Sequence, residues 1–155
     1  AQLDRFLMRV RLGYPSADQT VEILGSQQYG HPIDSLEPVA QPADIVSVAK
    51  AARAIHLDDK IKQYIVAIVE ETRESEHTVL GASPRAALDL AKTCQTYALS
   101  KGREYVIPDD IKHLAAPVIS HRVILDTNAR IQGVTAEQVI QTVLDRTPIP
   151  GNKPN

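Results

Sequence analysis

The chain has 155 residues, of which 43% are hydrophobic and 23% charged, and its formal net charge is −2. That length and composition suit one soluble globular domain with a core of its own, and the charge gives no electrostatic reason to expect nucleic-acid binding. A single cysteine, Cys94, excludes an internal disulfide and fits a reducing compartment, and no apolar run approaches the about 20 residues that span a bilayer.

The N-terminal fifteen residues are expected to contain the tail of a helix at 1–5 and then a β-strand at 6–12. Large apolar residues alternate with other side chains at Phe6, Met8, Val10 and Leu12. A period of two is typical of a strand, and Gly13-Tyr14-Pro15 then ends it. A strand with unpaired edges is expected to fray or to pair with another copy of the chain.

The rest of the chain predicts five or six helices. Each begins at a capping residue or proline and continues with apolar residues spaced at the helical period. The predicted starts are Ser16 (with Gln19 at the capping-box position), Pro42 or Ala43, Asp58, Ser83, Pro108 and Thr135. Residues 25–42 read as a loop, and a short strand at 105–107 is expected beside residues 55–57.

These elements predict a mostly α-helical bundle. Aromatic residues make up only 4% of the chain and tryptophan is missing, so Ala, Leu, Ile and Val must fill its core. The predicted core faces are Ile61, Tyr64, Ile65, Ile68 and Val69; Ala87, Leu90, Ala91, Cys94, Tyr97 and Ala98; Ile111, Leu114, Ala115, Val118 and Ile119; and Val139, Ile140, Val143 and Leu144.

The stretch GASPRAALDL, at residues 81–90, starts the most informative helix. Ser83 is a good N-cap, because its hydroxyl can accept from the free backbone N–H groups of the first turn. Pro84 suits the first helical position, where no N–H is needed. Arg85 follows in the first turn, where a cation faces the positive end of the helix dipole. That placement favours an anion bound by Arg85 and the helix N-terminus together.

The motifs SPRA, KGREYVIPDDIKHLAAPVISHRVIL and AQLDRFLMRVRLGYP, in their order along the chain, resemble the C-terminal part of the MoxR family of AAA+ ATPases. The resemblance implies a helical AAA+ lid at residues 16–147, a remnant of the nucleotide-binding core at residues 1–15 and a flexible tail at 148–155. It makes Arg85 the sensor 2 arginine, which contacts nucleotide phosphates, with Ser83 and Pro84 beside the nucleotide. It makes Arg5 the arginine finger.

One motif is missing from the sequence. No G-x-x-x-x-G-K-[ST] occurs to bind the β- and γ-phosphates, and no acidic pair follows a hydrophobic strand to hold Mg²⁺. This chain alone is therefore expected not to hydrolyse ATP or to hold a cofactor. Because it starts within a motif and without Met, we expect a piece of a longer ATPase that uses ATP and Mg²⁺.

The resemblance also implies partners for the longer protein. They are the nucleotide-binding core, neighbouring subunits in a ring taken to be a hexamer, and client proteins that are remodelled or matured, von Willebrand A-domain proteins among them. The family is cytoplasmic, and no nucleic acid or membrane segment is expected. Whether Arg85 acts on its own subunit's nucleotide or on a neighbour's stays open.

Each candidate residue also has a plain structural interpretation. Arg85 could pair with Glu74 or Glu76 on the surface, and Arg5 with Asp4. The acidic run at Glu70, Glu71, Glu74 and Glu76 could be a solvated helix end or a patch for a basic partner.

Three further side chains are candidates for metal binding or nucleophilic catalysis. His113 and His121 are eight residues apart, on one face of a continuous helix, but without the i, i+4 spacing of helical metal ligands. No cysteine pair or carboxylate cluster completes a site, so no metal is expected. Cys94 lies on an apolar helix face, where a free cysteine behaves as a small hydrophobe rather than a nucleophile.

Two other functions stay open from the sequence. The chain could be the lid of a related AAA+ motor of the chelatase or helicase clade. It could also be a non-catalytic helical module that binds a protein partner through its acidic face.

Overall fold

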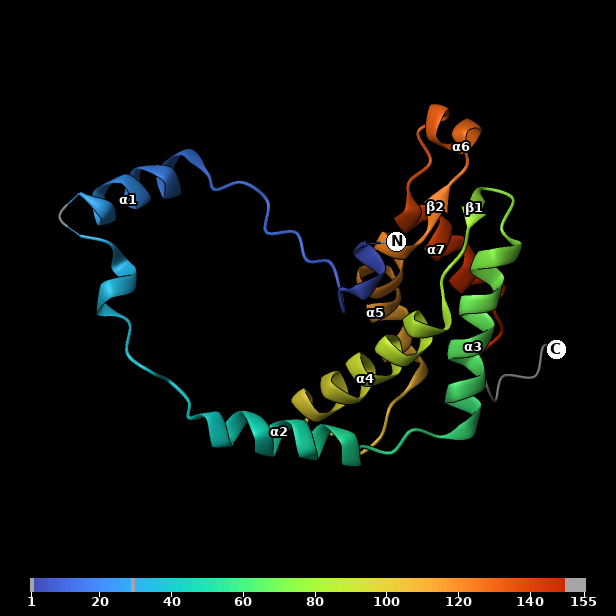
Figure 1. Cartoon of the computed structure of the whole chain (residues 1–155), viewed down its shortest axis with the longest axis horizontal. Coiled ribbons are helices and arrows are strands. Elements are labelled where there is room, and N and C mark those ends of the chain that lie inside the picture. Colours follow the sequence, from blue (N-terminus) through green and yellow to red (C-terminus); the bar gives the residue numbers. More distant parts are fainter. Residues whose placement is uncertain (1, 29, 150–155) are drawn as a thin grey trace. The chain divides into compact units, whose positions relative to one another are not determined.

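The computed structural model describes residues 2–28 and 30–149 (Figure 1). Within them the chain is mostly helical, as predicted. The helices are α1 (Ala17–Gln27), α2 (Pro42–Ala54), α3 (Asp59–Glu74), α4 (Pro84–Ser100), α5 (Pro108–Ile119), α6 (Thr127–Ile131) and α7 (Ala136–Arg146), and the shorter 3₁₀ helices are η1 (Leu3–Arg5), η2 (Pro32–Ser35) and η3 (Ser120–Arg122). No helix in this described part combines the length and the apolar character needed to cross a membrane.

The chain divides into two units. One comprises residues 1–9 together with 49–155, and the other comprises residues 10–48. The predicted domain boundaries at 15/16 and 147/148 stay predictions, and most of the predicted flexible tail lies outside the described residues.

The unit at residues 10–48 contains α1 and η2 but buries no side chain, since every described residue in it is exposed. Its helix α1 is well capped all the same. The Ser16 hydroxyl accepts from the Gln19 backbone, and the Gln19 side chain accepts from the Ser16 backbone, which is the predicted capping box. Local capping thus defines this helix, and burial within the unit adds nothing to it.

The other unit contains the hydrophobic core. Helix α4 packs against α3 and α5, and α7 packs against α3 and α5 in turn. Most of the predicted core is confirmed as buried, while Ala87, Ala91 and Tyr97 are only half-buried against it. The predicted caps also hold at Asp58, whose carboxylate accepts from the Lys60 backbone, and at Thr135.

The predicted strand at residues 6–12 is wrong, because the structure has no strand there. Residues 3–5 form η1, and residues 6–9, which follow, form hydrogen bonds with the helical bundle instead of with a strand. The Arg9 N–H donates to the Pro117 carbonyl at 2.8 Å, and Arg122 donates to the carbonyls of Phe6 and Leu7. The backbone N–H of Arg9 and the carbonyls of Phe6 and Leu7 are therefore paired with a helix carbonyl and a guanidinium instead of with a second strand.

The strands lie elsewhere. β1 (Thr78–Leu80) pairs antiparallel with β2 (Ile124–Leu125), a pairing that the sequence did not predict. The expected pairing of residues 105–107 with 55–57 reduces to one parallel bridge between His56 and Tyr105. These segments are too short for their side-chain alternation to be read from the sequence.

The connection between α4 and α5 is fixed by one ion pair. Gly102, with φ +68°, ends α4 in the left-handed conformation that favours glycine. Arg103 then makes two parallel bonds to the buried Asp110 carboxylate, at 2.6 and 2.9 Å, and a third to the Tyr105 carbonyl. Hydrogen bonding to Asp110 raises the pKa of the Arg103 guanidinium. Asp110 also accepts from the Ile107 backbone at the start of α5.

The turn that leads into α4 is packed directly against α3. The Arg73 Nε–H donates to the Ala82 carbonyl, and the Ala82 N–H donates to the Thr72 hydroxyl, both at 2.9 Å. Thr72 itself is fully buried. A Cβ atom on Gly81 would lie 2.7 Å from the Arg73 backbone, so only glycine fits without a shift of this turn.

We therefore predict that Gly81→Ala lowers the free energy of unfolding by about 1–3 kcal/mol, the usual cost of overpacking. Chemical denaturation monitored by circular dichroism measures it. Gly25→Ala is the matched control: it lies in helix α1 with open space around its Cβ position, so it should be neutral or slightly stabilising. An unchanged free energy of unfolding in Gly81→Ala would contradict the prediction.

Candidate functional site

Ser83 lies at the N-cap of α4, but its hydroxyl does not cap the helix, so that prediction is wrong. The hydroxyl instead donates to the Asp4 carboxylate at 3.1 Å and ties η1 to the start of α4. Pro84 occupies the first helical turn, as predicted, and no acidic residue lies in that turn. No side chain caps the N-terminus of α4, and its own first turn has no acidic residue, so the carboxylate at this helix end is that of Asp4, which bonds Ser83.

Arg85 points away from the core, with 55% of its side chain exposed. Its Nη2 lies 3.4 Å from the Arg5 carbonyl oxygen, and its Nε lies 3.9 Å from Oδ2 of Asp89, one turn further along α4. Its carboxylate partner is thus Asp89 and not Glu74 or Glu76. Both contacts are long, which leaves the guanidinium's donors largely uncommitted.

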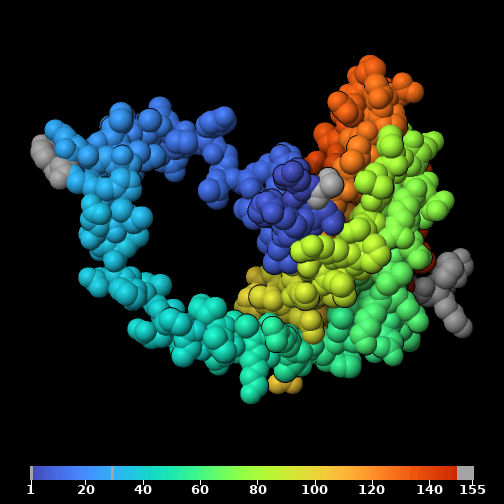
Figure 2. All heavy atoms as spheres, viewed as in Figure 1, coloured from blue at the N-terminus to red at the C-terminus, as the bar shows by residue number. Residues whose placement is uncertain are grey.

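Arg5 ends η1, and its guanidinium lies 5.3 Å from the centre of the Phe6 ring. The proposed ion pair with Asp4 is not formed, because Asp4 instead accepts from Ser83. The two candidate arginines, 80 residues apart in sequence, meet where the Arg85 side chain reaches the Arg5 backbone. Figure 2 shows the N-terminal segment in dark blue lying against the yellow-green atoms of α4.

A buried ion pair that the sequence analysis missed lies directly behind these arginines. Arg122 Nη2 donates to Oδ2 of Asp89 at 2.7 Å, and the Arg122 side chain is completely buried. The same nitrogen lies 2.6 Å from the Phe6 carbonyl and 3.3 Å from that of Leu7. One signal could have indicated it: Asp89 lies next to Leu90 on the apolar face of α4, where a carboxylate needs a buried partner.

The two histidines do not meet. Helix α5 ends at Ile119, so the continuous helix that would have placed them on one face is interrupted by η3. His113 stacks with Tyr97 at 5.1 Å between ring centres, and His121 Nε2 lies 3.0 Å from the Phe6 carbonyl. Among residues 2–28 and 30–149, no cluster of three or more metal-ligating side chains occurs.

Cys94 lies on the core-facing side of α4 and is completely buried. Burial, with a smaller effect from the nearby Asp110 charge, raises the pKa of its thiol to about 12. Since the thiolate is the reactive form, this environment opposes nucleophilic catalysis.

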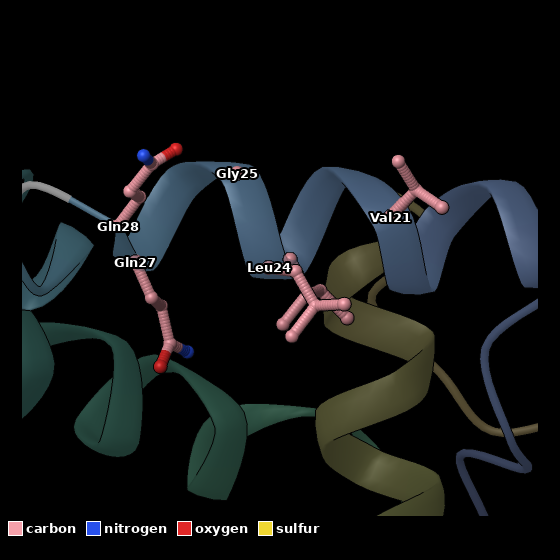
Figure 3. A pocket seen from close by; sticks show the side chains of 6 residues that line it. Val21, Leu24, Gly25, Gln27 and Gln28 are labelled. Carbon is pink, nitrogen blue, oxygen red and sulfur yellow. The ribbon is translucent and has the colours of Figure 1, made fainter.

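A hollow along α1 offers no comparable chemistry. Figure 3 shows its lining following one helix, and no charged side chain takes part. The lining residues are Val21, Ile23, Leu24, Gly25, Gln27 and Gln28. The candidate site is therefore the N-terminal end of α4, with Arg5, Ser83, Arg85, Asp89 and Arg122.

The helical fold agrees with that of an AAA lid. Residues 70–143 match the AAA lid domain family. That segment runs from the end of α3 into α7 and includes the entire helix α4 with Arg85.

Similarity to three curated relatives extends beyond the lid segment. The chain is 41% identical to the uncharacterised protein YeaC of Bacillus subtilis, over 97% of this chain and 47% of that protein. It is 30% identical to the chaperone MoxR1 of Mycobacterium tuberculosis, over 97% of this chain and 42% of that protein. It is 24% identical to MoxR of Paracoccus denitrificans, over 81% of this chain and 42% of that protein. The chain thus contains an AAA lid domain and is homologous to the MoxR proteins, so the resemblance seen in the sequence is confirmed.

A solved structure agrees with these relatives. A protein of Cytophaga hutchinsonii proposed to be an ATPase superposes with a TM-score of 0.84 at 27% identity, over 96% of this chain and 48% of that one. The chain spans about half the length of the proteins that it matches.

The buried thiol leads to a prediction. Cys94 should not react with a thiol reagent in the folded chain and should react on addition of denaturant. Because its pKa rises from the ordinary 9.0 to about 12 on folding, the unfolded chain loses the proton first. The free energy of unfolding should then fall between those pH values by about 1.4 kcal/mol per pH unit.

Cys94→Ala is the control, because it keeps every other titrating group. The difference in the pH slope of unfolding between the two chains isolates the thiol. Equal slopes, or rapid labelling of the folded chain, would contradict the burial of this group.

Proposed function

We propose that the chain is the lid of a longer MoxR-type AAA+ ATPase and that Arg85 is its sensor 2 residue, binding a phosphate group of ATP. The supporting observation is the state of the α4 N-terminus. It has no side-chain cap and no acidic residue in its first turn, and an exposed arginine lies there with only long contacts. Backbone N–H groups and a guanidinium together form a site for an anion, and Ser83 and Pro84 border it.

Arg5 is the proposed arginine finger of the same protein. It lies on the segment that precedes the lid, and its guanidinium stacks on Phe6 instead of pairing with Asp4. An arginine of this kind stabilises charge on the transferred phosphoryl group and normally acts on a neighbouring subunit in a ring. The proposed ring, a hexamer, therefore places Arg5 at an interface between subunits.

The wider role follows from the relatives. One of them carries the name chaperone, and we propose that ATP-driven movement of this lid is coupled to remodelling or maturation of client proteins, von Willebrand A-domain proteins among them. The longer protein supplies the nucleotide-binding core that holds ATP and Mg²⁺, and it works in the cytoplasm.

Arg85→Ala in the longer protein should weaken ATP binding and lower ATP turnover by roughly tenfold or more, because a charge-assisted bond to phosphate is lost. The isolated lid should keep its circular dichroism spectrum and unfolding midpoint, since the side chain is exposed. Arg130→Ala, an exposed arginine of α6, is the matched control and should change neither. Normal turnover in Arg85→Ala would contradict the assignment.

Arg5→Ala should behave differently. Hydrolysis should fall by about 10³-fold, the lower range for arginine fingers, while ATP affinity stays within a few-fold of wild type. Mixing Arg5→Ala subunits with subunits that keep Arg5 but cannot bind ATP should restore activity at the nucleotide sites of the Arg5→Ala subunits if the finger acts between subunits. Parallel losses of affinity and turnover would instead place Arg5 at its own subunit's nucleotide.

A further inference from the structure

We propose that Arg122 is a positioning residue that keeps Arg85 available for phosphate, because it serves as the permanent counter-ion of Asp89. This inference rests on the proposed function of Arg85. The proposed function concerns what Arg85 binds, whereas this inference concerns whether the Arg85 guanidinium is free of an ion pair within its own chain.

The first observation is that two arginines share one carboxylate oxygen. Oδ2 of Asp89 lies 2.7 Å from Arg122 Nη2 and 3.9 Å from Arg85 Nε. The shorter distance is that of a charge-assisted hydrogen bond, and the longer one is beyond hydrogen-bonding range. Asp89 is therefore satisfied chiefly by Arg122.

The second observation is the contrast in burial between the two arginines. The Arg122 side chain is completely buried, whereas 55% of that of Arg85 is exposed. Arg122 is also held by the carbonyls of Phe6 and Leu7, to which it donates at 2.6 and 3.3 Å. It cannot leave without stranding these acceptors, while Arg85 can leave at little cost.

The consequence follows from the burial of Asp89, which is only 8% exposed. A buried carboxylate with no counter-ion is strongly unfavourable. If Arg122 were absent, the nearest cation would be Arg85, one helical turn away and within reach of the same oxygen. Asp89 would then recruit Arg85, and an arginine engaged in a partly buried ion pair would be lost to the phosphate.

The structure also separates this role from simple stabilisation. The bundle contains a second buried aspartate with an arginine partner, Asp110 with Arg103, at the opposite end of α4. Removal of that arginine also strands a buried carboxylate, but at a place where Arg85 is not the neighbouring cation. Arg103→Gln is therefore a control of matched chemistry.

The test measures solvent exchange of the Arg85 Nε–H by NMR in the 155-residue chain, with the signal assigned by its loss in Arg85→Lys. In wild type we expect fast exchange. In Arg122→Gln exchange should slow by about tenfold, the effect of one hydrogen bond to a charged group. The double variant Arg122→Gln with Asp89→Asn removes the carboxylate as well, so fast exchange should return. Arg103→Gln should leave the Arg85 signal unchanged.

Two arms make the outcome decisive. Where Arg122→Gln fails to fold, Arg122→Lys retains a positive charge in poorer geometry and should give intermediate slowing. The proposal is overturned if the Arg85 Nε–H exchanges as fast in folded Arg122→Gln or in Arg122→Lys as in wild type. It is also overturned if exchange stays slow in the double variant.

The nucleotide arm uses the longer protein. Arg122→Gln should weaken ATP binding, and Asp89→Asn added to it should restore the affinity, which a loss of folding stability alone would not do. If Arg85→Ala binds ATP normally, the sensor assignment fails, while the exchange measurements still report whether Arg122 controls Arg85. Absence of rescue by Asp89→Asn, with Arg85→Ala defective, overturns the role of Arg122 and leaves the sensor assignment standing.

Discussion

The buried ion pair between Asp89 and Arg122 is the interaction on which the geometry of the candidate site depends. Breaking such a pair by removing one partner costs about 3–5 kcal/mol, because the remaining charge is left in the interior. The Arg122 nitrogen that bonds Asp89, Nη2, also donates to the carbonyls of Phe6 and Leu7. One guanidinium therefore joins three elements, namely η3, helix α4 and the N-terminal segment, and so brings the backbone of Arg5 to the side chain of Arg85.

Helix α4 is held at both ends by equally specific contacts. At its N-terminus, Gly81 allows the turn to touch the Arg73 backbone, and the Thr72 hydroxyl and the Arg73 guanidinium bond to Ala82. At its C-terminus, Arg103 and Asp110 fix the connection to α5. A rigid helix with an uncapped N-terminus is a suitable support for the proposed contact between Arg85 and a phosphate, because positional precision comes from the surrounding packing.

Much of the fold could be read from the sequence because it is local. The caps at Ser16, Asp58 and Thr135 and the apolar faces of α3, α5 and α7 appear where propensity and periodicity place them. The strand at residues 6–12 was wrong for the complementary reason. Period-two alternation indicates a strand only where another strand is present to pair, and here these backbone groups bond to a helix end and to Arg122.

For the candidate site, the sequence by itself determined the residue types and their place on the chain: an arginine in the first turn of a proline-started helix, and a second arginine near the N-terminus. These are properties of short segments, which local rules describe. Only the tertiary structure decided that Ser83 bonds to Asp4, that Asp89 is buried against Arg122, and that Arg85 meets the backbone of Arg5. Those contacts join residues 33 to 80 positions apart, and they arise from the packing of whole helices, which no local pattern specifies.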